Sequence, residues 1–172
     1  LNPDGGTVNS GDVTEYTYGV GATLPVGVTK TGYDFLGWFD GEDKVLTIGT
    51  EDLGDKTYTA HWKAKTYTVT FNEGYVGAPG ISSQAVDYRT AFGTLPAPER
   101  AGYTFEGWFN GQSRVTETTI WESDADVTLT AHWKVITYTI TYQDADGVSN
   151  PATYTGETAE FTLKNPTKTG YT

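Results

Sequence analysis

The chain has 172 residues and a formal net charge of -11, and 14% of its residues are aromatic. A surface this acidic repels phosphate backbones, so we expect no nucleic acid among its partners. The absence of Cys excludes disulfides, thiolate metal sites and a cysteine nucleophile. No apolar run is long enough to span a bilayer, so we expect no membrane insertion in this segment.

Alternation of apolar and polar residues predicts strands along the chain. In the stretch 66–71, for example, Tyr67, Val69 and Phe71 share one face and threonines occupy the other. The wealth of aromatic residues and threonine also favours pleated sheet over helix. In chain order, strands are predicted over residues 58–62, 66–71, 85–88, 104–109 and 127–133.

Turn residues separate these predicted strands. Asp40-Gly41 and Asn110-Gly111 follow apolar stretches and predict hairpins, because both residue types tolerate positive φ. Pro96 and Pro98 forbid a long helix before Gly102 and allow at most one helical turn there. A second short turn is predicted near residues 122–125. The expected unit is therefore a small mixed sheet of about four or five strands.

Gly37 and Gly107 lie inside predicted strands, where glycine costs stability unless the backbone requires it. A β-bulge would require it, and so would an aromatic ring packed over bare backbone. We therefore expect one of these two features at each glycine.

The same phrase occurs twice, as GYDFLGWF over 32–39 and as GYTFEGWF over 102–109. AHWK likewise recurs at 60–63 and 131–134, so the period is about 70 residues. The predicted copies are 1–64, with its first strand mostly missing, 65–134, which is complete, and 135–172, which stops before its GWF and AHW parts. Because both ends fall inside copies, we expect this segment to belong to a longer tandem array.

The combined pattern of GYxFxGWF, a strand ending in AHW and a TYTVTF strand resembles the Listeria–Bacteroides repeat, also called the internalin B-type repeat. The resemblance covers all three copies. It implies a mainly β fold of tandem, small β-grasp-like repeats with little helix. It also implies an extracellular place on a bacterial cell surface, with cell-wall anchoring through parts outside this segment. Members are not known for catalysis, so the resemblance implies neither enzyme activity nor a cofactor.

Aromatic residues that recur at equivalent positions are predicted to form the core of each copy rather than a binding site. Trp121 is different, because its counterpart in the first copy is Thr50. It is the best single candidate for a ligand contact on the surface, although the sequence favours core packing peculiar to that copy over such a contact. The predicted core residues are Tyr33, Phe35, Trp38, Trp62, Tyr103, Phe105, Trp108 and Trp133.

Other candidate sites carry weaker signals. His61 and His132 occupy equivalent positions and would form a metal or base site only if two copies faced each other; otherwise they are solvent-side strand residues. Residues 144–147 resemble the start of a calcium loop, but Thr155 stands where position 12 of such a loop needs glutamate, and a polar turn is the alternative. The chain contains Lys, Asn and Asp in plenty, so chemistry alone does not exclude a Lys–Asn or Lys–Asp isopeptide crosslink.

Two functions follow from these observations. The first is a stalk or spacer that projects a distal domain, with neighbouring repeats of the same chain as its partners. The alternative is an adhesive module whose repeats bind host glycan or protein. An enzyme is disfavoured, because no Ser, His and Asp occur together at motif spacing and no phosphate-binding loop is present.

Overall fold

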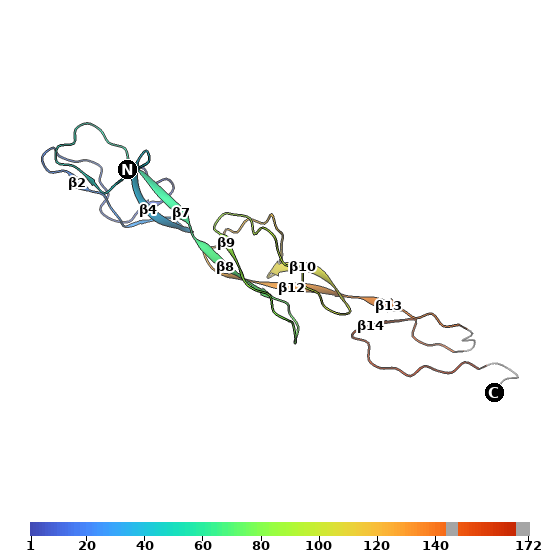
Figure 1. Ribbon diagram of the computed structural model, residues 1–172. Coiled ribbons are helices and arrows are strands. Elements are labelled where there is room, and N and C mark those ends of the chain that lie inside the picture. Colours follow the sequence, from blue (N-terminus) through green and yellow to red (C-terminus); the bar gives the residue numbers. More distant parts are fainter. Residues whose placement is uncertain (144–147, 168–172) are drawn as a thin grey trace. The chain divides into compact units, whose positions relative to one another are not determined.

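We describe the computed structural model over residues 1–143 and 148–167. The candidate calcium loop at 144–147 and the final GYT phrase lie outside these residues. Within them the chain forms strands and no helix (Figure 1), which confirms the prediction of a mainly β fold. The helical turns allowed before Gly102 and near residues 122–125 are absent from these described segments. In the first of these segments, Trp108 donates its indole Nε1–H to the carbonyl of Pro96 at 2.7 Å, which fixes the position of Pro96.

The strands are short, apart from those that carry the repeated phrases. In chain order they are β1 (Thr7–Val8), β2 (Ala22–Thr23), β3 (Val28–Thr29), β4 (Tyr33–Asp40), β5 (Asp43–Val45), β6 (Thr47–Ile48), β7 (Thr59–Ala64), β8 (Thr66–Asn72), β9 (Gln84–Asp87), β10 (Tyr103–Asn110), β11 (Ser113–Val115), β12 (Val127–Val135), β13 (Thr137–Thr139) and β14 (Thr153–Thr155).

The first copy is built on a three-stranded sheet of order β5-β4-β7, in which β4 pairs antiparallel with both neighbours. Figure 1 shows β4 and β7 side by side. Two small antiparallel sheets, β1-β3 and β2-β6, accompany it. A parallel bridge between Asn2 and Thr59 stands where a full first strand would run.

The second copy contributes a five-stranded sheet of order β11-β10-β12-β8-β9. Its central pair repeats the register of the first copy, because Phe105 lies opposite Trp133 as Phe35 lies opposite Trp62. In the third copy, β13 and β14 pair with Tyr138 opposite Tyr154. The same phrase therefore folds into the same strand pair in both copies that contain it.

Burial follows the alternation of the sequence. Val69 and Phe71 of β8 are buried, and the alternating Thr66, Thr68 and Thr70 are exposed. In β12, Val127, Leu129 and Ala131 are buried in the same way. Because side chains of a strand point alternately to opposite faces, each of these strands turns one apolar face to the core.

Both predicted hairpins form, displaced by one residue from the expected turn. Asp40 pairs with Asp43 and Asn110 with Ser113, so the turn residues are Gly-Glu and Gly-Gln rather than Asp-Gly and Asn-Gly. Gly41 and Gly111 have φ values of 60° and 59° and fill the first turn position. Glycine at that position is typical of a type II′ turn, which needs positive φ only there.

The bulges expected at Gly37 and Gly107 are confirmed. The register of β4 with β7 shifts between Phe35 and Gly37, and that of β10 with β12 shifts between Phe105 and Gly107. The glycines have φ values of 133° and 132°, which residues with a side chain rarely adopt. The neighbouring group is a basic side chain rather than an aromatic ring: a Cβ on Gly107 would lie 2.8 Å from Arg114 Nε.

By their internal contacts the described residues divide into two compact units, each described by itself. Unit 1 comprises 1–70, 83–93 and 117–127, and unit 2 comprises 71–82, 94–116 and the described residues from 128 onward. One core cluster of unit 1 consists of Leu24, Val28, Trp38, Ile48, Tyr58 and Ala60. In unit 2, Phe71 packs on Trp108 with ring centroids 4.8 Å apart.

Candidate ligand-binding groove

The repeated tryptophans are held as structural anchors. Trp38 and Trp108 are 2% and 1% exposed, and each donates its indole N–H to a proline carbonyl at 2.7 Å. Trp62 and Trp133, which are half-buried, also donate to backbone carbonyls, at 3.2 and 2.8 Å. A buried indole N–H needs such an acceptor, so these bonds fix each ring in place.

The remaining predicted core residues pack around these tryptophans, one group in each copy. In the first copy the Phe35 ring lies 5.6 Å from that of Trp38 and 5.3 Å from that of Trp62. Phe105 repeats these contacts in the second copy, at 5.5 and 5.3 Å. Tyr33 and Tyr103 are half-buried at the edge of each cluster. They leave part of each phenol ring on the surface.

Trp121, the sequence candidate for a surface contact, lies in the core. It is 8% exposed, and its ring packs on Phe92 with centroids 5.6 Å apart. Its backbone N–H donates to the Thr90 carbonyl at 2.9 Å, and its carbonyl accepts from Arg89 at 2.7 Å. A ligand could stack on this indole only if the segment opened, so the structure favours core packing peculiar to the second copy.

The two histidines take part in ring stacking within their strand pairs. Each stacks on a phenylalanine of the paired strand, His61 on Phe39 at 4.1 Å and His132 on Phe109 at 3.8 Å between ring centroids. Both imidazoles are half-buried rather than fully on the solvent side. Over residues 1–143 and 148–167, no cluster of three or more potential metal-ligating side chains from His, Cys, Asp and Glu occurs.

Ion pairs between lysine and aspartate lie at the surface. Lys30–Asp4, Lys56–Asp52 and Lys65–Asp34 are separated by 3.4, 3.7 and 3.8 Å, and every one of these side chains is at least 24% exposed. An isopeptide crosslink needs its lysine in an apolar pocket, which these three pairs do not provide.

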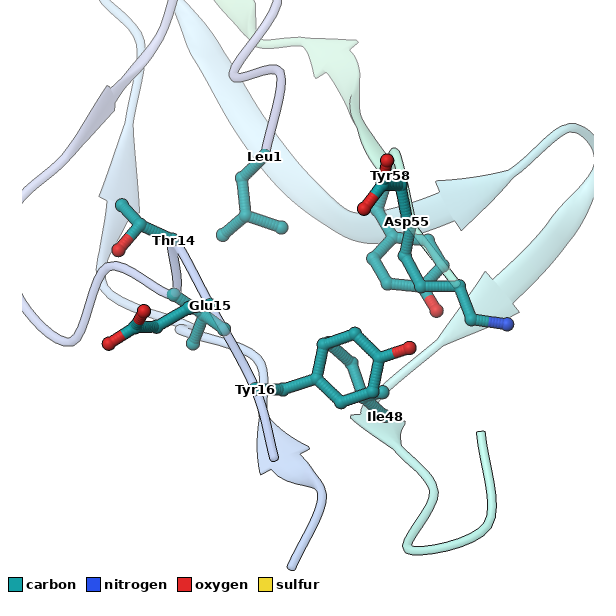
Figure 2. Close-up of a pocket in the computed structure, with 9 residues that line it drawn as sticks. Leu1, Thr14, Glu15, Tyr16, Ile48, Asp55 and Tyr58 are labelled. Carbon is teal, nitrogen blue, oxygen red and sulfur yellow. The ribbon is translucent and has the colours of Figure 1, made fainter. Parts of the chain in front are cut away.

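One pocket of about 380 Å³ lies in the first copy (Figure 2). Leu1, Tyr16, Ile48 and Tyr58 surround it, and Tyr16 donates its hydroxyl to the Gly54 carbonyl at 2.6 Å. Burial raises the pKa of Tyr58, and the nearby Lys56 ammonium partly opposes that effect. The second copy places the larger Phe71 at the position of Leu1, so this pocket is not a common feature of the repeats.

A polar groove of about 510 Å³ lies where the first copy continues into the second, wholly within unit 1. We call it the joint groove. Its wall includes residues just before and within β4, residues at the start of β8, and Asp124. The side chains that carry its chemistry are those of Lys30, Tyr33, Asp34, Lys65, Tyr67 and Asp124.

Lys30 is held firmly at one side of the joint groove. Its ammonium donates to the Asp4 carbonyl at 2.7 Å and lies 4.8 Å from the centroid of the Tyr33 ring and 5.5 Å from that of Trp62. Cation–π attraction of this kind orders a long side chain. Lys65 pairs loosely with Asp34 at 3.8 Å. Desolvation raises the pKa of Tyr67, and the Asp124 carboxylate raises it further.

The second copy has a related groove of about 550 Å³ next to Tyr103 and Trp133. Arg100 takes the place of Lys30, with its guanidinium carbon 3.6 Å from the centroid of Tyr103 and 4.9 Å from that of Tyr75. The polar residues of the joint groove do not recur there, because Asp34 is replaced by Thr104 and Lys65 by Ile136. The cation over tyrosine is common to both copies, whereas the set of donors and acceptors is not.

The sequence profile of the Listeria-Bacteroides repeat domain matches three stretches of the chain, residues 2–60, 67–132 and 138–172. The chain belongs to this family. No solved structure matches it.

Curated relatives of this repeat chain are longer proteins. Two come from Evansella cellulosilytica and are named as a Gly-rich membrane protein and a membrane protein; each is 30% identical, over 77% and 82% of the chain. Internalin H of Listeria monocytogenes is 30% identical over 62% of the chain. The matched regions cover only 16%, 22% and 20% of these relatives.

Sequence reasoning missed the joint groove of this Listeria–Bacteroides repeat chain. A signal was present, because a basic residue stands two positions before each Gly-Tyr, as Lys30, Arg100 and Lys168. The alternation that predicts strands says nothing of side chains brought together from separate strands. Asp124 and Lys30, far apart along the chain, line one groove only in the folded unit.

Proposed function

We propose that this chain is a non-catalytic segment of a bacterial cell-surface protein that acts as a stalk or spacer. Membership of the repeat family supports this, as do relatives named as membrane proteins and as an internalin. In the described residues no helix is long and apolar enough to cross a membrane. The proposal includes a β-grasp-like unit, cell-wall anchoring outside this segment, and a distal domain that the array projects.

The observation that carries the proposal is the joint between the first two copies. β7 ends at Ala64 and β8 begins at Thr66, so a single residue separates them. Lys65 donates its backbone N–H to the Gly32 carbonyl at 2.9 Å and accepts from the Tyr88 N–H at 2.9 Å. Both backbone groups of the joint are therefore bonded within the protein, whereas a flexible linker would leave them to water.

The aromatic ring of Tyr88 packs against the same joint. Tyr88 is 9% exposed and packs edge-on against Tyr33, with centroids 5.3 Å apart. A Cβ on Gly32 would overlap the Tyr88 ring, so the backbone and the ring are in direct contact. Such packing restricts bending, and in a tandem array it converts repeat number into length.

Small-angle X-ray scattering of the chain in solution tests this proposal. We expect an elongated particle whose flexibility increases when a Gly-Ser pair is inserted after Ala64. The same insertion after Gly41, in an exposed hairpin turn, is the matched control and should leave the scattering curve unchanged. A compact particle, or equal effects of the two insertions, would contradict a stiff stalk.

A second function, adhesion through the repeats themselves, is favoured by the joint groove. Its tyrosines and charged side chains lie in a depression of a size that binds small ligands. A stalk function alone does not require such a set of side chains. Binding of the chain to host cells, lost when the groove is altered, would support this second role.

A further inference from the structure

We propose that the joint groove binds a neutral oligosaccharide. The proposal rests on the second function above, adhesion through the repeats, and names its site and its ligand class. It is independent of the stalk role, which depends on the backbone of the joint and on Tyr88.

The size of the groove admits a short oligosaccharide. Its volume of about 510 Å³ lies within the range of small-molecule sites. The groove is open to solvent, so a longer glycan could extend beyond it. Tyr33 and Tyr67 line the groove, and both residues are half-buried. Pyranose rings present flat faces of C–H groups that pack on such aromatic surfaces.

The polar groups match hydroxyls better than charged ligands. Asp34 and Asp124 supply acceptors, and Lys30 and Lys65 supply donors. A sugar hydroxyl both donates and accepts, so it can pair with either kind of group. The two lysines are matched by Asp34 and Asp124, and Lys30 is also ion-paired with Asp4 at 3.4 Å, so the groove offers no net attraction to an anion.

The ordering of these side chains favours recognition. Lys30 is fixed by the Asp4 carbonyl and by two aromatic rings, so little conformational freedom is lost when a ligand binds. Lys65 and Asp34 are only loosely paired at 3.8 Å and are 46% and 63% exposed. An exposed pair of this kind contributes little to stability, so its groups are available to a ligand.

Acidic glycans and nucleic acids fit less well. The chain carries a net charge of -11, and Asp34 and Asp124 stand at the groove itself. Both features repel an anionic ligand. The groove of the second copy lacks counterparts of Asp34 and Lys65, so we assign the site to the first joint only.

The test uses the full chain and a panel of defined probes. Lactose, N-acetyllactosamine, cellotriose and chitotriose represent neutral glycans, and sialyllactose represents acidic ones. Backbone amide NMR spectra recorded up to about 10 mM probe detect even weak binding. We expect at least one neutral probe to shift the resonances of Tyr33, Lys65 and Tyr67, and sialyllactose to bind more weakly.

The variant Asp34→Ala/Lys65→Ala removes both partners of the exposed pair and leaves no charge unpaired. We expect it to bind the neutral probe about tenfold more weakly or worse, while keeping its unfolding midpoint. The matched control, Lys56→Ala/Asp52→Asn, removes another surface Lys–Asp pair of the same unit and keeps an acceptor for the Gly49 N–H. This control should bind like the unaltered chain.

Three results would overturn the inference: no neutral probe shifts the groove resonances, the two double variants bind equally well, or sialyllactose is preferred. The role as a stalk is judged separately, by scattering from the same samples. If the chain binds host cells through a protein and no glycan shifts the resonances of the groove residues, the adhesive function is kept and the glycan site is rejected.

Discussion

The two joints between copies share a backbone arrangement and differ in their side chains. At the first joint the Lys65 N–H donates to the Gly32 carbonyl at 2.9 Å, and at the second the Ile136 N–H donates to the Gly102 carbonyl at 2.8 Å. Over Gly32 lies the ring of Tyr88, whereas among the described residues a Cβ on Gly102 would meet only the Cα of Gly156 within 4 Å, at 3.9 Å.

A phenol–carboxylate hydrogen bond replaces the ring at the second joint. Tyr103 donates its hydroxyl to Glu157 Oε1 at 2.5 Å on the exposed surface. Buried aromatic packing is worth more than an exposed hydrogen bond, which competes with water. The backbone therefore sets the path of the chain through a joint, while one side chain sets how firmly the joint is held.

The largest effect is expected from Tyr88→Ala, which removes the ring from the first joint. We expect a loss of about 3 kcal/mol of unfolding free energy, because a buried aromatic side chain is deleted. The distribution of distances between spin labels at positions 42 and 112, now Glu42 and Gln112, should also broaden. Because the chain has no Cys, two cysteines introduced there can be labelled selectively and measured by pulsed electron paramagnetic resonance. Tyr88→Phe keeps the ring and serves as the control.

Alanine at the two joint glycines gives the next largest difference. Gly32 and Gly102 have φ values of 76° and 78°, so either substitution strains the backbone by about 1 kcal/mol. Only at Gly32 does the new methyl group also overlap the Tyr88 ring, which should add about 1 kcal/mol or more. Urea unfolding of both variants measures this; equal midpoints would show that the ring yields freely.

A smaller gain is expected from Gly156→Tyr, which gives the second joint a ring. Gly156 lies outside the left-handed region and a Cβ there meets no atom of residues 1–143 and 148–167 within 4 Å, so the side chain can be accommodated there. We expect about 0.5–1 kcal/mol of added stability if the new ring packs near Gly102. Unfolding of the third copy, followed by the NMR signals of Tyr138 and Tyr154, reports the change. A lower midpoint would mean that the second joint rejects a ring.

The smallest effect concerns pH at the second joint. The hydrogen bond to Glu157, followed by desolvation, raises the pKa of Tyr103 above its ordinary value of 10.0. The neutral phenol is thus favoured in the folded chain, so this contribution is complete below pH 10.0 and is lost as pH rises through the folded pKa. Tyr103→Phe should remove one late-titrating group from the ultraviolet titration of tyrosinate.

Several features of the fold could be predicted from particular residues. Glycine at 37 and 107 within alternating strands indicated either a bulge or a ring packed over the backbone, and bulges form at both glycines with φ near 130°. The hairpins were predicted one residue early, because only the glycine and not the preceding Asp40 or Asn110 adopts positive φ. Trp121 could not be placed from its neighbours, since its partner Phe92 lies on a different segment.

By itself the sequence determined the family, the mainly β class and the aromatic residues that recur in each copy. Those properties depend on local alternation, glycine conformation and repetition, which are written along the chain. Only the tertiary structure decided that Trp121 is buried, that Tyr88 closes the first joint, and that Lys30, Lys65 and Asp124 share one groove. These depend on which distant segments pack together, and side chains from separate strands meet only when the unit has folded.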